Sequence, residues 1–151
     1  MTTATGSDPG DFVVGRPLVV GEASGALLRL DAPLSFWGGF DPASGRVIDR
    51  AHPQVGESLA GRIVAMPGSR GSSGTPGVLG ESLRLGTGPT ALLITKADVN
   101  LVAGALVASS LYSRVCPVLL LGEGEFRRLP ENGIALVDAS GRVSWEPDSE
   151  E

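Results

Sequence analysis

A glycine- and serine-rich segment, residues 67–75 (Pro-Gly-Ser-Arg-Gly-Ser-Ser-Gly-Thr), carries most of the chemistry that this sequence offers. Its hydroxyls, its backbone N–H groups and the guanidinium of Arg70 are the donors that a carboxylate or a phosphate needs. A helix is expected to start just after it, and the first turn of a helix favours negative charge because its N–H groups lack partners. The segment therefore predicts an anion site, without identifying the anion.

The familiar phosphate and hydrolase motifs do not fit this segment. A P-loop ends in Gly-Lys-Ser/Thr, and the segment contains no lysine. The dinucleotide-binding pattern is not matched at this turn. The Gly-x-Ser-x-Gly nucleophile elbow also fails, because the run Gly71-Ser72-Ser73-Gly74 brings its second glycine one residue early. Nucleotide binding and esterase chemistry are therefore disfavoured.

The single histidine leaves two other chemistries open. His52, Asp49 and Ser72 are the residue types of a Ser-His-Asp triad, and His52 alone is a candidate phosphate carrier. Spacing along the chain tests neither hypothesis. The simpler interpretation is that His52, which precedes a proline, caps a turn or contacts a substrate.

The elements that must position these residues follow from the hydrophobic pattern. Residues 62–66 predict a buried strand before the serine segment, and residues 77–85 predict a helix after it. Further strands are expected at 90–95 and 117–121, separated by a second helix that Asp98 caps. This β-α-β-α-β alternation is typical of parallel strands joined by right-handed crossovers.

The remaining elements are mostly strands. The pattern predicts short strands at 16–20 and 26–30, and a hairpin formed by 134–137 and 142–145. The second helix, which should run to Tyr112, is apolar on most sides, so we expect it to be broadly buried.

The segment from 31 to 53 shows little periodicity, and a loop of this length in a compact domain is usually functional or an interface. It holds three aromatic residues, Phe36, Trp37 and Phe40, among glycines. They predict either a small core cluster under the loop or a wall that covers a site or meets a partner.

Composition limits the possible partners. The chain has 151 residues and a net charge of -5, which disfavours nucleic acid and anionic membranes. We expect one domain over 12–147, a flexible N-terminus over 1–11 and an acidic tail over 148–151. No signal peptide or membrane span is visible, which predicts a cytoplasmic protein. Cys116, the one cysteine, should be a buried apolar residue, so no metal site is predicted in this chain.

Four features together resemble the small subunit of the aconitase X family. They are the run Ser-Phe-Trp-Gly-Gly-Phe-Asp-Pro at 35–42, Asp49, His-Pro at 52–53 and Arg-Gly-Ser-Ser at 70–73. The resemblance extends over about residues 15–121. It implies an α/β fold, the swivelling β/β/α domain of aconitases, in which a β-rich first half precedes the β-α-β-α-β second half.

The same resemblance implies a dehydratase subunit that eliminates water from a small hydroxy acid. It implies a heterodimer whose large subunit carries iron or an iron–sulfur cluster, and little activity for this chain alone. Ser72 matches the loop serine that acts as base in the family, and Ser73 is the second choice. Substrate contacts are then expected from Arg70, Gly71, Ser73, Ser35 and His52.

The family loop tends to read Arg-Gly-Ser, a small residue, then Ser-Gly-Ser-Gly-Val-Leu, and the match does not extend to Thr75. A bacterial-looking composition favours cis-3-hydroxy-L-proline as the substrate. Mevalonate 5-phosphate is the alternative, and Arg46 and Arg50 would supply cations for its phosphate. A non-catalytic module that binds an anion or a protein partner is the rival from another functional class.

Overall fold

The structure, a computed structural model, describes residues 12–68, 70 and 72–146. The predicted flexible N-terminus and acidic tail lie outside these residues. The elements in chain order are β1 (Phe12–Val14), β2 (Arg16–Val19), β3 (Ala23–Arg29), α1 (Phe36–Gly39), β4 (Phe40–Asp41), β5 (Arg46–Val47), β6 (Ile63–Met66), α2 (Thr75–Leu85), β7 (Ala91–Ile94), α3 (Val99–Tyr112), β8 (Val118–Leu120), α4 (Glu123–Arg128), β9 (Ile134–Val137) and β10 (Arg142–Glu146).

One eight-stranded sheet organises the molecule, in the order β1-β10-β9-β3-β6-β7-β8-β2. Strands β3, β6, β7 and β8 run parallel to their neighbours in this series, whereas β1, β2, β9 and β10 pair antiparallel. Helices α2 and α3 are the crossovers between β6, β7 and β8, which confirms the predicted β-α-β-α-β unit. The β9–β10 hairpin is confirmed as well.

The sheet curls so that its two edges approach each other. Strands β1 and β2 stand at opposite ends of the strand order, yet only Gly15 separates them in the chain. The Gly15 N–H donates to the carbonyl of Gly141, 2.8 Å away. A Cβ at Gly15 would lie 2.6 Å from Cδ2 of Leu121 and 3.0 Å from the carbonyl oxygen of Leu120, so a side chain here would require Leu121 to shift.

Alternation along the buried strands creates two cores, one on each side of the sheet. In β6, Ile63 and Ala65 face the interior of the curled sheet, whereas Val64 and Met66 face the helices. This follows from the two-residue period of a strand. Because both faces are covered, these strands are continuous apolar runs rather than alternating ones.

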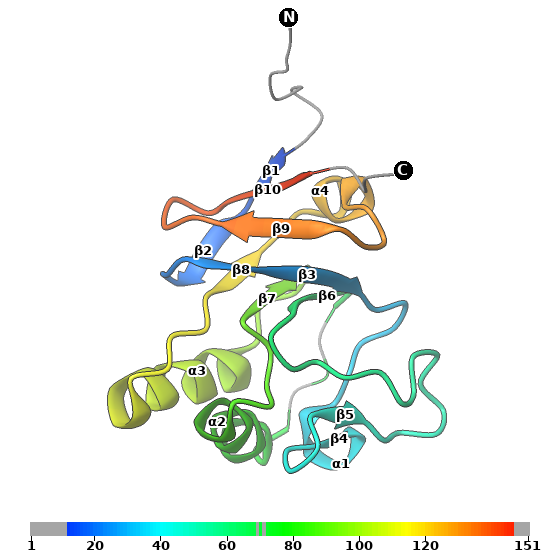
Figure 1. The fold of residues 1–151 in the computed structure, drawn as a ribbon, viewed down its shortest axis with the longest axis vertical. Helices are drawn as coiled ribbons and strands as arrows, with labels where there is room; N and C mark the ends of the chain where they lie inside the picture. The colour runs from blue at the N-terminus through cyan, green and yellow to red at the C-terminus, as the bar shows by residue number, and fades with distance from the viewer. Residues whose placement is uncertain (1–11, 69, 71, 147–151) are drawn as a thin grey trace, which may run out of the picture.

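Helices α1, α2 and α3 lie on one side of the sheet, and α4 lies near β9 and β10 on the other (Figure 1). The side chain of Asp98 accepts hydrogen bonds from the N–H groups of Asn100 and Leu101, which confirms the predicted cap of α3. The broad burial expected for α3 is wrong. Its outer face leaves Val99, Leu106 and Leu111 exposed, because only the opposite face packs on the sheet and α2. No helix of the described residues is long and apolar enough to cross a bilayer.

The first half is more regular than its sequence indicates. Strand β3 begins at Ala23 rather than at residue 26. The region 31–53 contains the short turn α1 and the two-residue strands β4 and β5, which pair antiparallel. Strand β1 and helix α4 were not predicted, because three and six residues are too few for a clear periodicity.

Candidate functional site at the start of α2

The serine segment connects the carboxyl end of β6 to the first turn of α2. In a parallel sheet, the carboxyl ends of adjacent strands lie at one edge, where ligands usually bind. A hydrogen bond joins the loops that follow β6 and β7, from the Gly68 N–H to Oγ1 of Thr95, at 2.5 Å. The segment therefore has a fixed starting point at the edge of the sheet.

Local hydrogen bonds hold Ser72 in place. Its N–H donates to Oγ1 of Thr75 at 3.2 Å, and its carbonyl accepts from the N–H of Thr75 at 3.0 Å. Thr75 is 1% exposed, so this anchor is part of the core. The Ser72 Oγ in turn accepts from the Gly74 N–H at 3.2 Å. An N–H donor aimed at this oxygen would stabilise the negative charge of a serine alkoxide.

The N–H groups in the first turn of α2 carry partial positive charge, and no side chain caps them. Gly74 is the N-cap residue and lacks a capping side chain, and Pro76 has no N–H. The Gly77 N–H finds no acceptor among the described residues. Arg70 is exposed and makes no ion pair within the described ranges. Gly71, also expected to contact substrate, lies outside the described residues.

The aromatic cluster of the long loop divides between the core and this site. Phe36 and Phe40 are buried and meet edge to face with 5.1 Å between ring centroids, as expected of a core cluster. Trp37 is 62% exposed. Together with Ser72, Ser73 and Gly74 it lines an open hollow of about 360 Å³. The core-cluster interpretation is confirmed for Phe36 and Phe40, whereas the wall that covers a site or meets a partner stays a prediction for Trp37.

Ser35 and His52 do not line this hollow and instead bond to backbone atoms. The Ser35 hydroxyl donates to the carbonyl of Trp37 at 2.9 Å, which steadies the aromatic turn. His52 is 5% exposed, and its Nε2 lies 2.9 Å from the carbonyl oxygen of Ala32 while its Nδ1 accepts from the Gln54 N–H at 3.0 Å. Both ring nitrogens thus have backbone partners.

The alternative Ser-His-Asp triad is not assembled. The Asp49 carboxylate accepts from the Ala51 N–H at 2.9 Å, and neither it nor Ser72 bonds the imidazole of His52. A phosphate carrier needs an accessible ring nitrogen, and the His52 ring is buried with both nitrogens engaged. The histidine instead links its own turn to the backbone at Ala32.

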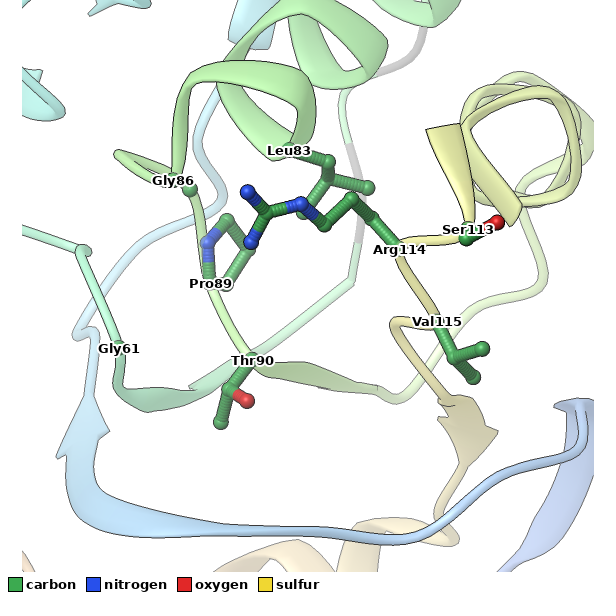
Figure 2. Close-up of a pocket in the computed structure, with 9 residues that line it drawn as sticks. Gly61, Leu83, Gly86, Pro89, Thr90, Ser113, Arg114 and Val115 are labelled. Atoms are coloured by element: carbon green, nitrogen blue, oxygen red, sulfur yellow. The ribbon is translucent and has the colours of Figure 1, made fainter. Parts of the chain in front are cut away.

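A second pocket, of about 260 Å³, lies at the opposite edge of the parallel strands (Figure 2). Figure 2 shows Arg114 extending across it toward Pro89. Gly86 and Ser113, the C-cap residues of α2 and α3, also line it. Carbonyl groups at helix C-termini disfavour anions, so helix polarity favours the serine loop over this pocket for the predicted anion site.

No group of three or more potential metal ligands occurs among the described residues. Burial raises the pKa of the Cys116 thiol to about 12, which opposes the thiolate form that binds metals. The described part of the chain therefore lacks a donor set that fits an iron or iron–sulfur centre.

Comparison with known proteins identifies the fold. A family model described as the aconitase X swivel domain matches residues 12–145. The chain belongs to this family. A cis-3-hydroxy-L-proline dehydratase of Pseudomonas aeruginosa is 49% identical over 112 residues, which are 74% of this chain and 19% of that protein. The chain thus spans about a fifth of that relative's length.

Other relatives of the swivel domain are separate small chains. A phosphomevalonate dehydratase small subunit of Methanothermobacter thermautotrophicus is 38% identical over 62% of this chain and 71% of its own length. The crystal structure of Thermococcus kodakaraensis aconitase X in its holo-form matches with a TM-score of 0.79 and 29% identity, over 90% of this chain and 98% of that one. These matches confirm the swivel-domain fold inferred from the sequence, and the curated relatives are named as dehydratases.

Two features of this swivel domain were missed by reasoning from the sequence. One is the link from Thr95 to the serine loop, which the carboxyl-end rule for parallel strands would have indicated. Lys96, exposed and next to Thr95, lies at the same edge of the sheet as Arg70. The other is the contact of Trp37 with Gly74, for which the sequence contains no local signal.

Proposed function

We propose that this chain is the small, swivel-type subunit of a heteromeric dehydratase that removes water from cis-3-hydroxy-L-proline. Ser72 is the base, and a separate large subunit supplies iron or an iron–sulfur cluster. One observation carries the proposal: the Ser72 Oγ, held at the start of α2 and facing an open hollow, accepts a hydrogen bond from the Gly74 N–H. The 49% identity to a protein named for this reaction supports the choice of substrate.

The proposed step is a proton abstraction next to a carboxylate. The Ser72 oxygen, as alkoxide, takes the proton from the carbon that bears the carboxylate, and the C–H electron pair becomes the new carbon–carbon double bond. The C–O bond on the neighbouring carbon breaks with its electron pair on oxygen, and the departing hydroxide takes a proton from solvent to leave as water. Ser72 returns its acquired proton to solvent, which regenerates the alkoxide. A Lewis-acidic metal, if the large subunit holds one, would supply polarisation of that leaving oxygen.

The protein's own groups stabilise the negative charges in this step. The Gly74 N–H stabilises charge on the serine oxygen, and the Gly77 N–H, which has no acceptor among the described residues, adds to the positive end of α2. Arg70 and Ser73 are proposed to bind the substrate carboxylate. Ser35, first expected as a substrate contact, is proposed to hold the turn that carries Trp37. His52, also expected to contact substrate, is proposed to stabilise the long loop through its backbone partners.

A phosphomevalonate dehydratase small subunit is the second candidate. It is supported by 38% identity to the phosphomevalonate dehydratase small subunit of Methanothermobacter thermautotrophicus, over 62% of this chain and 71% of that one. On this alternative the exposed Arg46 and Arg50 would help to bind the phosphate.

Turnover by the reconstituted complex tests the proposal. This chain and its large subunit are co-expressed and assayed with stereoisomers of 3-hydroxyproline and with mevalonate 5-phosphate. We expect water elimination from cis-3-hydroxy-L-proline and none from either chain alone.

The base assignment has its own test in the same complex. Ser72→Ala should lower kcat by about 10²–10⁴-fold, the usual contribution of a general base, and Ser73→Ala should mainly raise KM. Exchange of the substrate's α-hydrogen in D₂O should be lost with Ser72→Ala. Unchanged turnover and exchange in that variant would rule out Ser72 as the base.

A further inference from the structure

We propose that Trp37 determines specificity by forming the wall of the hollow that faces the substrate ring and its ammonium group. This inference rests on the proposed function, because it assigns the substrate class at the same hollow. The Trp37 wall would favour a substrate with a compact cationic ring over an acyclic phosphorylated acid.

The indole of Trp37 is fixed at one side and open at the other. A Cβ built on Gly74 would overlap Cδ1 of Trp37 and lie 2.7 Å from Cγ and 2.9 Å from Nε1. All three atoms belong to the five-membered ring, so this part of the indole rests on the loop backbone. The side chain is nevertheless 62% exposed, which leaves aromatic surface free for a ligand.

The turn that carries Trp37 is also held from behind. The Ser35 hydroxyl donates to the Trp37 carbonyl, and the neighbouring rings of Phe36 and Phe40 are buried in the core. An exposed tryptophan on such an anchored turn is a rigid surface, and binding to a rigid surface sacrifices little conformational freedom. Trp37 is therefore built to present its ring rather than to fill the core.

The chemistry of the lining selects the kind of ligand. Trp37, Ser72, Ser73 and Gly74 contribute one aromatic ring, two hydroxyls and no charged side chain. An aromatic face attracts a cation, and it also packs well against a small saturated ring. The secondary ammonium of a proline ring satisfies both conditions at once. A phosphorylated acyclic acid offers neither of them.

Two inhibitors that differ only in the ring nitrogen separate this role from simple packing. L-Proline carries the ammonium, whereas cyclopentanecarboxylate has the same ring size and carboxylate without it. In the complex turning over cis-3-hydroxy-L-proline, Trp37→Leu should raise the Ki of L-proline about tenfold. The Ki of cyclopentanecarboxylate should change about twofold or less, and Trp37→Phe should lie between wild type and Trp37→Leu for L-proline.

Trp145→Phe is the matched control, because Trp145 packs against the core inside the curled sheet and does not line the hollow. It should leave both Ki values unchanged. Equal changes for the two inhibitors in Trp37→Leu, or no change for either, would overturn the inference while wild-type turnover still supports the proposed function. A wild-type complex without turnover of cis-3-hydroxy-L-proline would overturn both. Circular dichroism confirms that each variant is folded.

Discussion

The indole of Trp37 lies directly on the backbone of Gly74, so that any Cβ at position 74 would collide with the ring. The same glycine donates its N–H to the Ser72 Oγ at 3.2 Å. A side chain from the aromatic turn thus controls the space next to the residue that orients the proposed base. The two segments lie 37 positions apart in the chain and are brought together only by the fold.

Gly74→Ala should disrupt this arrangement. The backbone of Gly74 has φ -83° and ψ -13°, which alanine adopts readily, so any effect comes from the collision with Trp37. We expect kcat of the complex to fall at least about tenfold, because misplacing a reacting group by about 1 Å costs up to 10²-fold.

Gly77→Ala is the control for that variant, because nothing lies within 4 Å of a Cβ at this position. It should keep wild-type turnover and gain roughly 0.5–1 kcal/mol of stability, as expected for glycine to alanine in a helix. Adding Trp37→Leu to Gly74→Ala should remove the collision and reduce the combined loss below the sum of the single effects. Wild-type kcat in Gly74→Ala would contradict this account.

His52→Phe should affect stability rather than chemistry. It leaves the Ala32 carbonyl and the Gln54 N–H without their imidazole partner, and a buried unpaired group costs about 1–3 kcal/mol. Urea unfolding should report this loss, whereas kcat per folded complex should stay within about twofold. A folded variant whose kcat fell about a hundredfold would instead assign the imidazole to substrate or phosphoryl chemistry.

Cys116 should make the stability of the chain depend on alkaline pH. Burial raises the pKa of its thiol from 9.0 to about 12, so folding favours the protonated form. Its stabilising contribution is complete below pH 9 and is lost as pH rises toward 12. At pH 10 the loss is on the order of 1 kcal/mol, because the unfolded thiol is then mostly ionised while the folded thiol is still protonated.

The measurement compares urea unfolding of wild type and Cys116→Ala at pH 8 and pH 10. The variant lacks the thiol, so its free energy of unfolding should fall less between the two pH values. The other titrating groups contribute equally to both proteins, so their effects cancel in the comparison. Thiol reagents should label native Cys116 slowly and the unfolded chain quickly. Equal falls in stability for both proteins would refute the prediction.

Asp98→Ala should weaken the anchoring of α3. Its carboxylate accepts from the N–H groups of Asn100 and Leu101, at 2.9 and 3.4 Å, and loss of such a cap costs about 1 kcal/mol. Thermal unfolding should show a lower Tm for Asp98→Ala, with Asp98→Asn close to wild type because asparagine caps equally well. An Asp98→Ala chain as stable as wild type would disprove the role of this cap.

Local signals in the second half of the chain were strong enough to predict its elements. Apolar runs at 63–66 and 91–94 are buried on both faces, and the carboxylate of Asp98 caps α3 as predicted. The segment at 67–75 combines a strand end, hydroxyls and a helix start within nine residues, so its place at the carboxyl edge followed from the order of elements alone. The aconitase X resemblance came from short motifs and was confirmed by the family match over 12–145.

Residue order determined which strands and helices form, and it placed Ser72 between β6 and α2. Tertiary structure alone decided what surrounds that serine: it directed Phe36 and Phe40 into the core, left Trp37 exposed on Gly74, and buried His52 between backbone partners. The reason is physical. Strand and helix periodicities are set by neighbours a few residues away, whereas exposure and contact depend on distant segments that meet only when the sheet curls and the long loop packs onto α2.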